Sequence, residues 1–128
     1  MIGTVVGMLF AAAPVLTPAP QFTQDWVWCA NSGHAFSLDL SISGCTAAIR
    51  FGREPPHNLS IAFHNRANAH FGKGDLNSAI ADYDLAIQQD ADSAGAVANR
   101  GRAFAAKGDS ARAYRSLDDL DRAIADFD

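Results

Sequence analysis

The feature that most constrains the fold of this chain is a stretch of sequence that recurs at a fixed distance. Residues 65–75 (NRANAHFGKGD) return 34 residues later as residues 99–109 (NRGRAFAAKGD), with Asn, Arg, Ala, Lys, Gly and Asp in step. A second stretch, residues 75–84, returns in related form at residues 119–128. A fixed period indicates a supersecondary unit that packs against copies of itself. We therefore expect a repeat array.

Within the first copy, apolar residues are spaced as on one face of an α-helix. In residues 76–87 they recur at gaps of three and four, and residues 61–71 carry a second such stripe. Between the two stripes, Gly74 can adopt the positive φ that ends a helix, and Asp75 is a suitable N-cap for the next one. The predicted unit is a helix, a tight turn and an antiparallel helix.

The second copy departs from the first after its turn. A helix is predicted from Ser110, but the second recurring stretch arrives ten residues late, at Asp119. Either a helical segment is inserted, or the second helix of this unit is longer. Apolar residues continue at gaps of four, three, four and three, at Ala113, Leu117, Leu120, Ile124 and Phe127. Since neither Gly nor Pro occurs in residues 110–128, one continuous long helix is favoured.

These residues resemble the tetratricopeptide repeat, a 34-residue helix–turn–helix unit. In a unit beginning at Ser60, the family's small, alanine and aromatic positions are matched by Ala67, Ala79, Tyr83 and Ala86. His70 stands where the family has an aromatic residue, and Ala91 where it often has Pro. In a unit beginning at Ala94, the matches are Gly101, Phe104 and Ala113. The resemblance covers residues 60–128 and implies an all-α fold of antiparallel helical hairpins, stacked as a short right-handed solenoid.

Residues 1–20 form an apolar leader of different composition. The run from Ile2 to Leu16 is shorter than the roughly 20 apolar residues of a membrane span, so no integral span is expected in the mature chain. It is typical of the apolar core of a secretory signal peptide, which predicts a periplasmic or secreted protein. Against this, no Lys or Arg precedes the run, and both candidate cleavage sites are followed by Pro. A buried N-terminal helix, with a membrane-tethered or cytoplasmic location, is the alternative.

The two cysteines, Cys29 and Cys45, lie between the leader and the repeats. With a leader present, a disulfide formed in an oxidising compartment is the simplest explanation. Closing a loop of about 16 residues would stabilise the fold by roughly 3 kcal/mol in the chain-entropy model. Two buried free thiols are the alternative.

Residues 36–43 alternate strictly between apolar and polar, as in a half-buried strand. The overlapping stretch from Leu38 to Ile49 has helical spacing, and a single strand would have no partner in a helical chain. A helix is therefore favoured, and residues 21–56 are predicted to form a degenerate first hairpin that ends at a Pro pair. Units at 57–93 and 94–128 follow. This arrangement resembles the cysteine-bearing unit ahead of tetratricopeptide arrays in some exported bacterial proteins.

No motif for catalysis, metal binding or a cofactor is recognised. The net charge of −4 argues against a nucleic-acid surface. The four histidines include no i, i+4 pair, and their spacing from the cysteines matches no zinc pattern. The acidic residues lie beside the apolar stripes, so we expect them on solvated helix faces. These are Asp82, Asp84, Asp90, Asp92, Asp118, Asp119, Asp121, Asp126 and Asp128. We expect no enzyme activity.

The resemblance implies a groove lined by the first helix of each unit. The residues that the family pattern places there are His64, Asn65, Asn68, Phe71, Asn99 and Arg102. Asparagine amides can hydrogen-bond an extended peptide backbone, and an arginine can bind a carboxylate. His64 and Ala98 lack the basic character of the family's two-carboxylate clamp, so a receptor for C-terminal peptides is not expected. The resulting prediction is a non-catalytic, protein- or peptide-binding scaffold of an exported protein.

The alternative is a structural self-assembly unit. The sequence stops at Asp128 within the predicted last helix, and terminal repeats normally need a polar cap. The apolar stripe of that helix could then pair with a second copy as a homodimer, or extend the solenoid end to end. Its predicted contact residues are Leu117, Leu120, Ile124 and Phe127.

Overall fold

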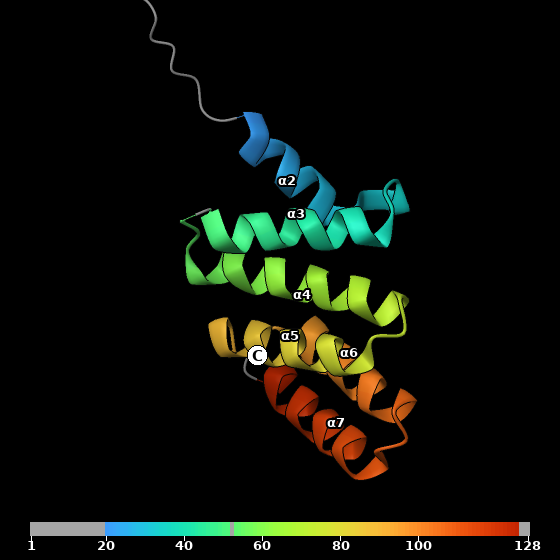
Figure 1. Ribbon diagram of the computed structural model, residues 1–128. Coiled ribbons are helices and arrows are strands. Elements are labelled where there is room, and N and C mark those ends of the chain that lie inside the picture. Colours follow the sequence, from blue (N-terminus) through green and yellow to red (C-terminus); the bar gives the residue numbers. More distant parts are fainter. Residues whose placement is uncertain (1–19, 52, 126–128) are drawn as a thin grey trace, which may run out of the picture.

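The chain folds into a stack of helices (Figure 1). The structure, a computed structural model, describes residues 20–51 and 53–125. In this part of the chain it has six α-helices, one 3₁₀ helix and no strand. They are α2 (Pro20–Ala30), η3 (Ser32–His34), α3 (Leu38–Phe51), α4 (Pro56–Gly72), α5 (Leu76–Gln89), α6 (Ala94–Ala106) and α7 (Ser110–Ala125). Residues 1–19 of the predicted leader, and Phe127, lie outside the described residues.

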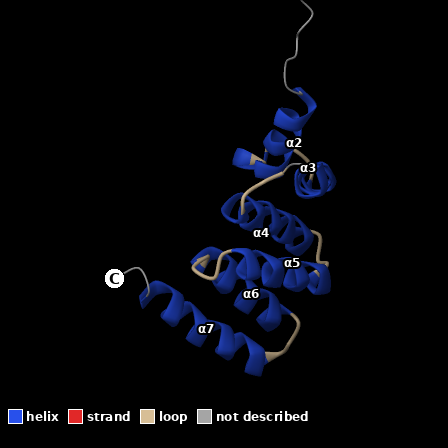
Figure 2. Cartoon of the chain, turned by 90° about the vertical axis from the view of Figure 1, so that its left-hand side faces the viewer, coloured by secondary structure: helices blue, strands red, loops and turns tan. Residues whose placement is uncertain are grey.

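Each α-helix packs against the next one along the chain, from α2 to α7 (Figure 2). The prediction of an all-α fold built from stacked helical hairpins is therefore confirmed. The helix prediction for residues 36–43 is also confirmed from Leu38 onward, where α3 begins. The predicted long second helix is confirmed as one continuous helix over residues 110–125.

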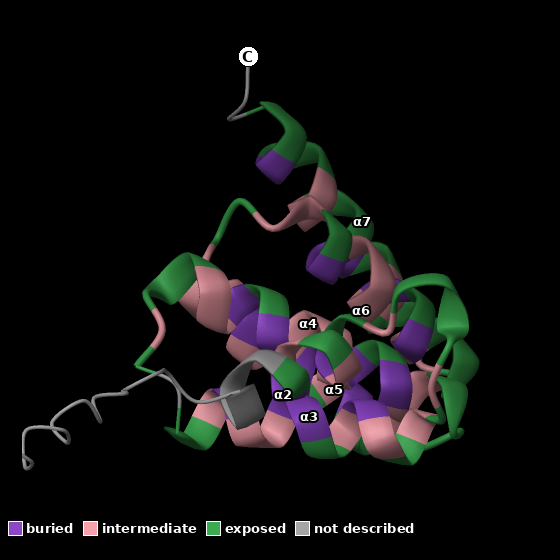
Figure 3. Ribbon diagram, turned by 90° about the horizontal axis from the view of Figure 1, so that it is seen from above, coloured by how far each residue is buried: buried purple, intermediate pink, exposed green. Residues whose placement is uncertain are grey.

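Small residues make up most of the core between the helices. Around the buried ring of Tyr83 lie the fully buried alanines of α4, α5 and α6, which are Ala67, Ala79, Ala86, Ala96 and Ala103. Figure 3 shows such buried positions on α5 and α6. Alanine lets helix backbones approach closely, while the half-buried Phe63 and Phe71 fill the remaining space. The small-residue pattern of the repeat is therefore a packing requirement.

The two repeated turns use glycine in the left-handed region. Gly74 has φ +82° and Gly108 has φ +84°, as the sequence predicted for Gly74. Of the two aspartates that follow these glycines, only Asp109 makes a capping hydrogen bond with its side chain. Asp109 Oδ1 accepts a hydrogen bond from the backbone N–H of Arg112 at 3.1 Å. Asp75 occupies the N-cap position of α5, as predicted, although its side chain makes no capping hydrogen bond.

A disulfide between Cys29 and Cys45 joins α2 to α3, as predicted. Close packing of the two helices also depends on Gly44. A Cβ atom at that position would lie 2.5 Å from the backbone oxygen of Asp25. The predicted first hairpin is followed by α4, which begins at the second residue of the Pro pair, Pro56. Proline is favoured in the first turn of a helix, because its missing N–H is not needed there.

The arginine of the recurring stretch bridges helices in both copies. Arg66 donates to both carboxylate oxygens of Asp82 on α5, at 2.7 and 2.8 Å, and to Thr46 Oγ1 on α3 at 3.2 Å. Arg100 donates to Asp84 on α5 at 2.9 Å and to Asp119 on α7 at 3.0 Å. Each arginine therefore ties its own helix to one helix before it and one after it.

This arrangement corrects the prediction that all the aspartates lie on solvated faces. Asp82 is buried, with 5% of its surface exposed, because Arg66 neutralises it across the interface between α4 and α5. A buried carboxylate is tolerated only when a partner of opposite charge and good hydrogen-bond geometry accompanies it.

Candidate functional site

Three hollows follow one another along one side of the stack. The first lies between the α2–α3 hairpin and α4, the second between α4, α5 and α6, and the third between α6 and α7. The first and second share His34 and Asn68, and the second and third share Arg102. Because neighbouring hollows have lining residues in common, we describe them together as one groove.

Most of the side chains predicted for the site line this groove. Asn65 and Asn68 line the first hollow, and Asn68, Phe71, Asn99 and Arg102 line the second. His64 does not line a hollow but lies directly beside Asn99. The family pattern and these hollows therefore point to the same side of α4 and α6.

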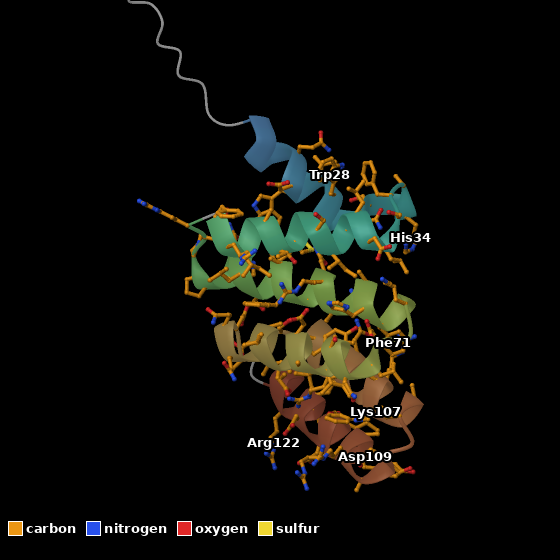
Figure 4. The ribbon with its side chains drawn as sticks, in the orientation of Figure 1. Trp28, His34, Phe71, Lys107, Asp109 and Arg122 are labelled. Atoms are coloured by element: carbon orange, nitrogen blue, oxygen red, sulfur yellow. A yellow bond between two sulfur atoms is a disulfide. The ribbon has the colours of Figure 1, made fainter. Side chains whose placement is uncertain are left out.

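Sequence reasoning missed several groove residues, among them His34, Tyr83 and Tyr114. Figure 4 shows His34 and Phe71 at the same edge of the stack. His34 comes from the α2–α3 loop, and the Asn31-Ser32-Gly33 turn just before it was the available signal. Tyr83 was assigned to the core, where its ring does lie, but its hydroxyl reaches the groove.

The loop that carries His34 is held by Asn31. Asn31 adopts a left-handed conformation with φ 43°, which asparagine tolerates better than most residues. Its side chain accepts a hydrogen bond from the backbone N–H of Phe36 at 2.8 Å and donates to the backbone oxygen of Phe36 at 3.0 Å. These two bonds close the loop and place His34 at the mouth of the first two hollows.

A hydrogen-bonded network orients the amides of the second hollow. The side-chain amide of Asn99 donates to His64 Nε2 at 3.2 Å and to Asn68 Oδ1 at 3.1 Å. The Tyr83 hydroxyl donates to the same Asn68 oxygen at 2.6 Å. Because Asn68 Oδ1 accepts two hydrogen bonds, the amide orientation is set, and the Asn68 NH₂ group is directed elsewhere.

Burial fixes the protonation states of this network. It lowers the pKa of His64, so the imidazole is neutral at pH 7 and its Nε2 can accept from Asn99. Burial raises the pKa of Tyr83 to about 12, although the nearby charge of Arg102 acts in the opposite direction. The phenol therefore remains a donor to Asn68 over the whole physiological range.

In the second hollow, two polar groups can still bind a ligand, and these are the Asn68 NH₂ group and the Arg102 guanidinium. The Asn68 NH₂ group makes no hydrogen bond to any residue that the structure describes. The Arg102 guanidinium lies 5.9 Å from the centre of the Phe71 ring and donates to Asn99 Oδ1 at 3.4 Å. Among the described residues, no carboxylate pairs with it. The hollow thus offers an amide donor beside a positive charge supported by an aromatic face.

The groove excludes acidic side chains. The chain has 14 Asp and Glu residues and a net charge of −4, yet none of them is among the residues that line the three hollows. Several aspartates are instead held in ion pairs between helices, among them Asp82, Asp84 and Asp119. The groove is therefore neutral to positive on a protein that is negative overall.

Two other features are absent from residues 20–51 and 53–125. No group of three or more His, Cys, Asp or Glu side chains is arranged there to hold a metal ion. No helix in these ranges combines the length and the apolar character needed to cross a bilayer.

Comparison with known families identifies the repeat. Residues 61–93 match the family model of the tetratricopeptide repeat. Residues 61–93 are therefore a tetratricopeptide repeat. The matched segment begins within α4, includes all of α5 and ends just before α6. Tetratricopeptide repeats generally serve as scaffolds for protein interactions, so the family implies a protein partner. No curated protein matches the chain.

Proposed function

We propose that this protein is a non-catalytic scaffold whose groove binds an extended segment of a protein partner. The observation that carries this proposal is the second hollow, where the amide of Asn68 is oriented by its neighbours beside an unpaired Arg102. A preoriented amide loses little conformational freedom on binding, which favours recognition of a peptide carbonyl.

The chemistry of the groove indicates what such a segment contains. The Asn68 NH₂ group donates to a backbone carbonyl, and Arg102 binds a carboxylate of the ligand. The third hollow, which Ala105, Ala113 and Leu117 help to line, accommodates an apolar side chain. Since the groove has no acidic lining residues, neutral and acidic segments bind better than basic ones.

The test is a selection from a library of random 12-residue peptides on the immobilised full chain. The affinities of selected peptides are then measured in solution by fluorescence anisotropy. The double variant Asn68→Ala with Arg102→Ala is expected to weaken binding by about 10-fold to 100-fold, because hydrogen bonds to charged groups contribute roughly 1.5–3 kcal/mol.

The matched control is Asn77→Ala with Arg122→Ala, which removes the same residue types outside the groove. Asn77 accepts a hydrogen bond from Lys107, and Arg122 pairs with Asp118 on α7. The control is expected to bind like the wild type, and circular dichroism verifies that both variants keep their helices. Equal affinity of the groove variant and the wild type, or failure to select any peptide, would contradict the proposal.

We also propose that the protein works in an oxidising compartment after export. The disulfide that joins α2 to α3 supports this, because such bonds persist mainly outside the cytosol. Mass spectrometry of the protein, expressed from its first residue in a bacterial host with a periplasm, is expected to find a shortened N-terminus and no free thiol. An intact Met1 together with two free thiols would exclude export.

A further inference from the structure

The outer surface of α7 carries large apolar side chains that the fold does not cover. Tyr114, Leu117 and Ile124 expose 72%, 53% and 50% of their surface, respectively. At 100° per residue, Leu117 and Ile124 lie about 20° apart around the helix axis, and Tyr114 lies about 60° from Leu117. The three side chains therefore form one stripe, which we call the α7 stripe.

The α7 stripe continues onto the neighbouring helix. The buried residues Ser116 and Ala123 mark the side of α7 that packs on α6. Next to that side, the third hollow brings Tyr114 and Leu117 together with alanines of α6. The exposed apolar surface thus spans two helices, which gives a broader contact area than a single helix offers.

Each of the two helices also contributes an exposed charged residue, and the two charges are opposite. Arg102 lies on the α6 side, where it lines the third hollow. Asp121 lies on α7, about 40° around the helix axis from Leu117 and on the same side of it as Tyr114. Both residues are exposed, and neither forms an ion pair with any residue in the described ranges.

We propose that a second copy of this chain covers the α7 stripe, with the two α7 helices antiparallel about a two-fold axis near Leu117. A two-fold interface must be self-complementary. Here the axis places Arg102 of each copy against Asp121 of the other, while the apolar stripes face each other. Antiparallel helices also align their dipoles favourably. Arg102 and the third hollow belong to both surfaces, so this dimer contact and a peptide in the third hollow would compete for the same residues.

Structure also refines which residues the contact uses. Leu117 and Ile124 were predicted and are exposed, whereas Leu120 is half-buried and turned toward α6. Tyr114 was not predicted, because the predicted stripe reached Leu117 from Ala113, although Tyr114 lies three residues before Leu117. Leu117 is consequently the best position for a test, since a change at Leu120 would also disturb packing against α6.

The first measurement is the mass of the full chain by sedimentation velocity over a range of protein concentrations. The wild type is expected to approach twice its monomer mass as concentration rises. Leu117→Asp should raise the dimer dissociation constant by at least about 100-fold, because it would bury a carboxylate in an apolar contact. Ala111→Asp, on an exposed part of α7 outside the stripe, is the matched control and should not change the mass.

The second measurement is a charge exchange. Arg102→Asp alone and Asp121→Arg alone are each expected to raise the dimer dissociation constant by about 10-fold, since each places like charges in contact. The two changes together should restore it to within about threefold of the wild type. A wild type that stays monomeric at every concentration would overturn the proposal, as would a double variant that dimerises no better than the single ones.

Discussion

Among individual residues, His64 shows most clearly how burial sets the protonation state of a side chain. Its ring lies 5.9 Å from that of Tyr83, and its Nε2 accepts a hydrogen bond from Asn99. Only the neutral imidazole can accept this bond. Protonation of His64 would therefore remove one of the interactions that orient the groove amides.

This predicts a dependence of stability on pH. Burial lowers the pKa of His64 below its ordinary value of 6.5, so below that pH the unfolded chain binds a proton that the folded chain does not. The contribution of His64 to the free energy of unfolding is complete above about pH 6.5. It decreases as the pH falls toward the lowered pKa of the folded state.

Urea unfolding of the wild type and His64→Gln at several pH values between about 7.5 and 5 checks this sign. The variant keeps a side-chain acceptor for Asn99 but cannot take up a proton, so it should lose less stability over this range. His57→Gln, at a side chain that is 73% exposed, is the control and should behave like the wild type. If the free energy of unfolding changed equally with pH in the wild type and in His64→Gln, this account of His64 would be contradicted.

Between helices, the bridging arginines connect neighbouring elements. Arg66 links α4 to α3 and α5, and Arg100 links α6 to α5 and α7. The recurrence of this residue in both copies is thus explained by its place between three helices. These links also join the disulfide-bonded hairpin to the matched repeat.

Asp82→Asn is expected to destabilise the protein by about 3 kcal/mol, because it leaves the guanidinium of Arg66 without its countercharge in a buried interface. Asp118→Asn is the matched control. Asp118 pairs with Arg122 on the surface of α7, and such exposed pairs contribute less than about 1 kcal/mol. Equal losses for the two variants in chemical denaturation would mean that the burial of Asp82 has no energetic consequence.

The helices themselves could be predicted from local patterns. Apolar spacing, the glycines of the two turns and the Pro pair were enough to place α3, α4, α5 and α7, because these signals act within a few residues. The sequence placed the end of α3 and the start of α4 less accurately, because Pro can begin a helix as well as break one.

Details of the site depended on contacts between distant residues. The burial of Asp82 is decided by Arg66, 16 residues away, and nothing in the periodicity distinguishes it from the exposed Asp118. His34 reaches the groove only because Asn31 closes its loop. Sequence patterns define the faces of helices, but they do not specify which polar side chains meet across them.

For the whole molecule, the distribution of charge is the feature that favours binding in the groove. Several aspartates form ion pairs between helices, whereas none of the residues that line the three hollows is acidic. An acidic segment of a partner is therefore expected to be attracted to the groove and repelled by the acidic remainder of the surface.

The central claim is that a peptide occupies this groove, and NMR spectra of the full chain with a selected peptide test it most directly. The side-chain amide signals of Asn68 and Asn99, and the guanidinium signal of Arg102, are predicted to shift on titration. The amide signal of Asn77, which lies outside the groove, should stay in place. Shifts confined to Asn77 and its surroundings on α5, with Asn68 and Arg102 unchanged, would contradict the account.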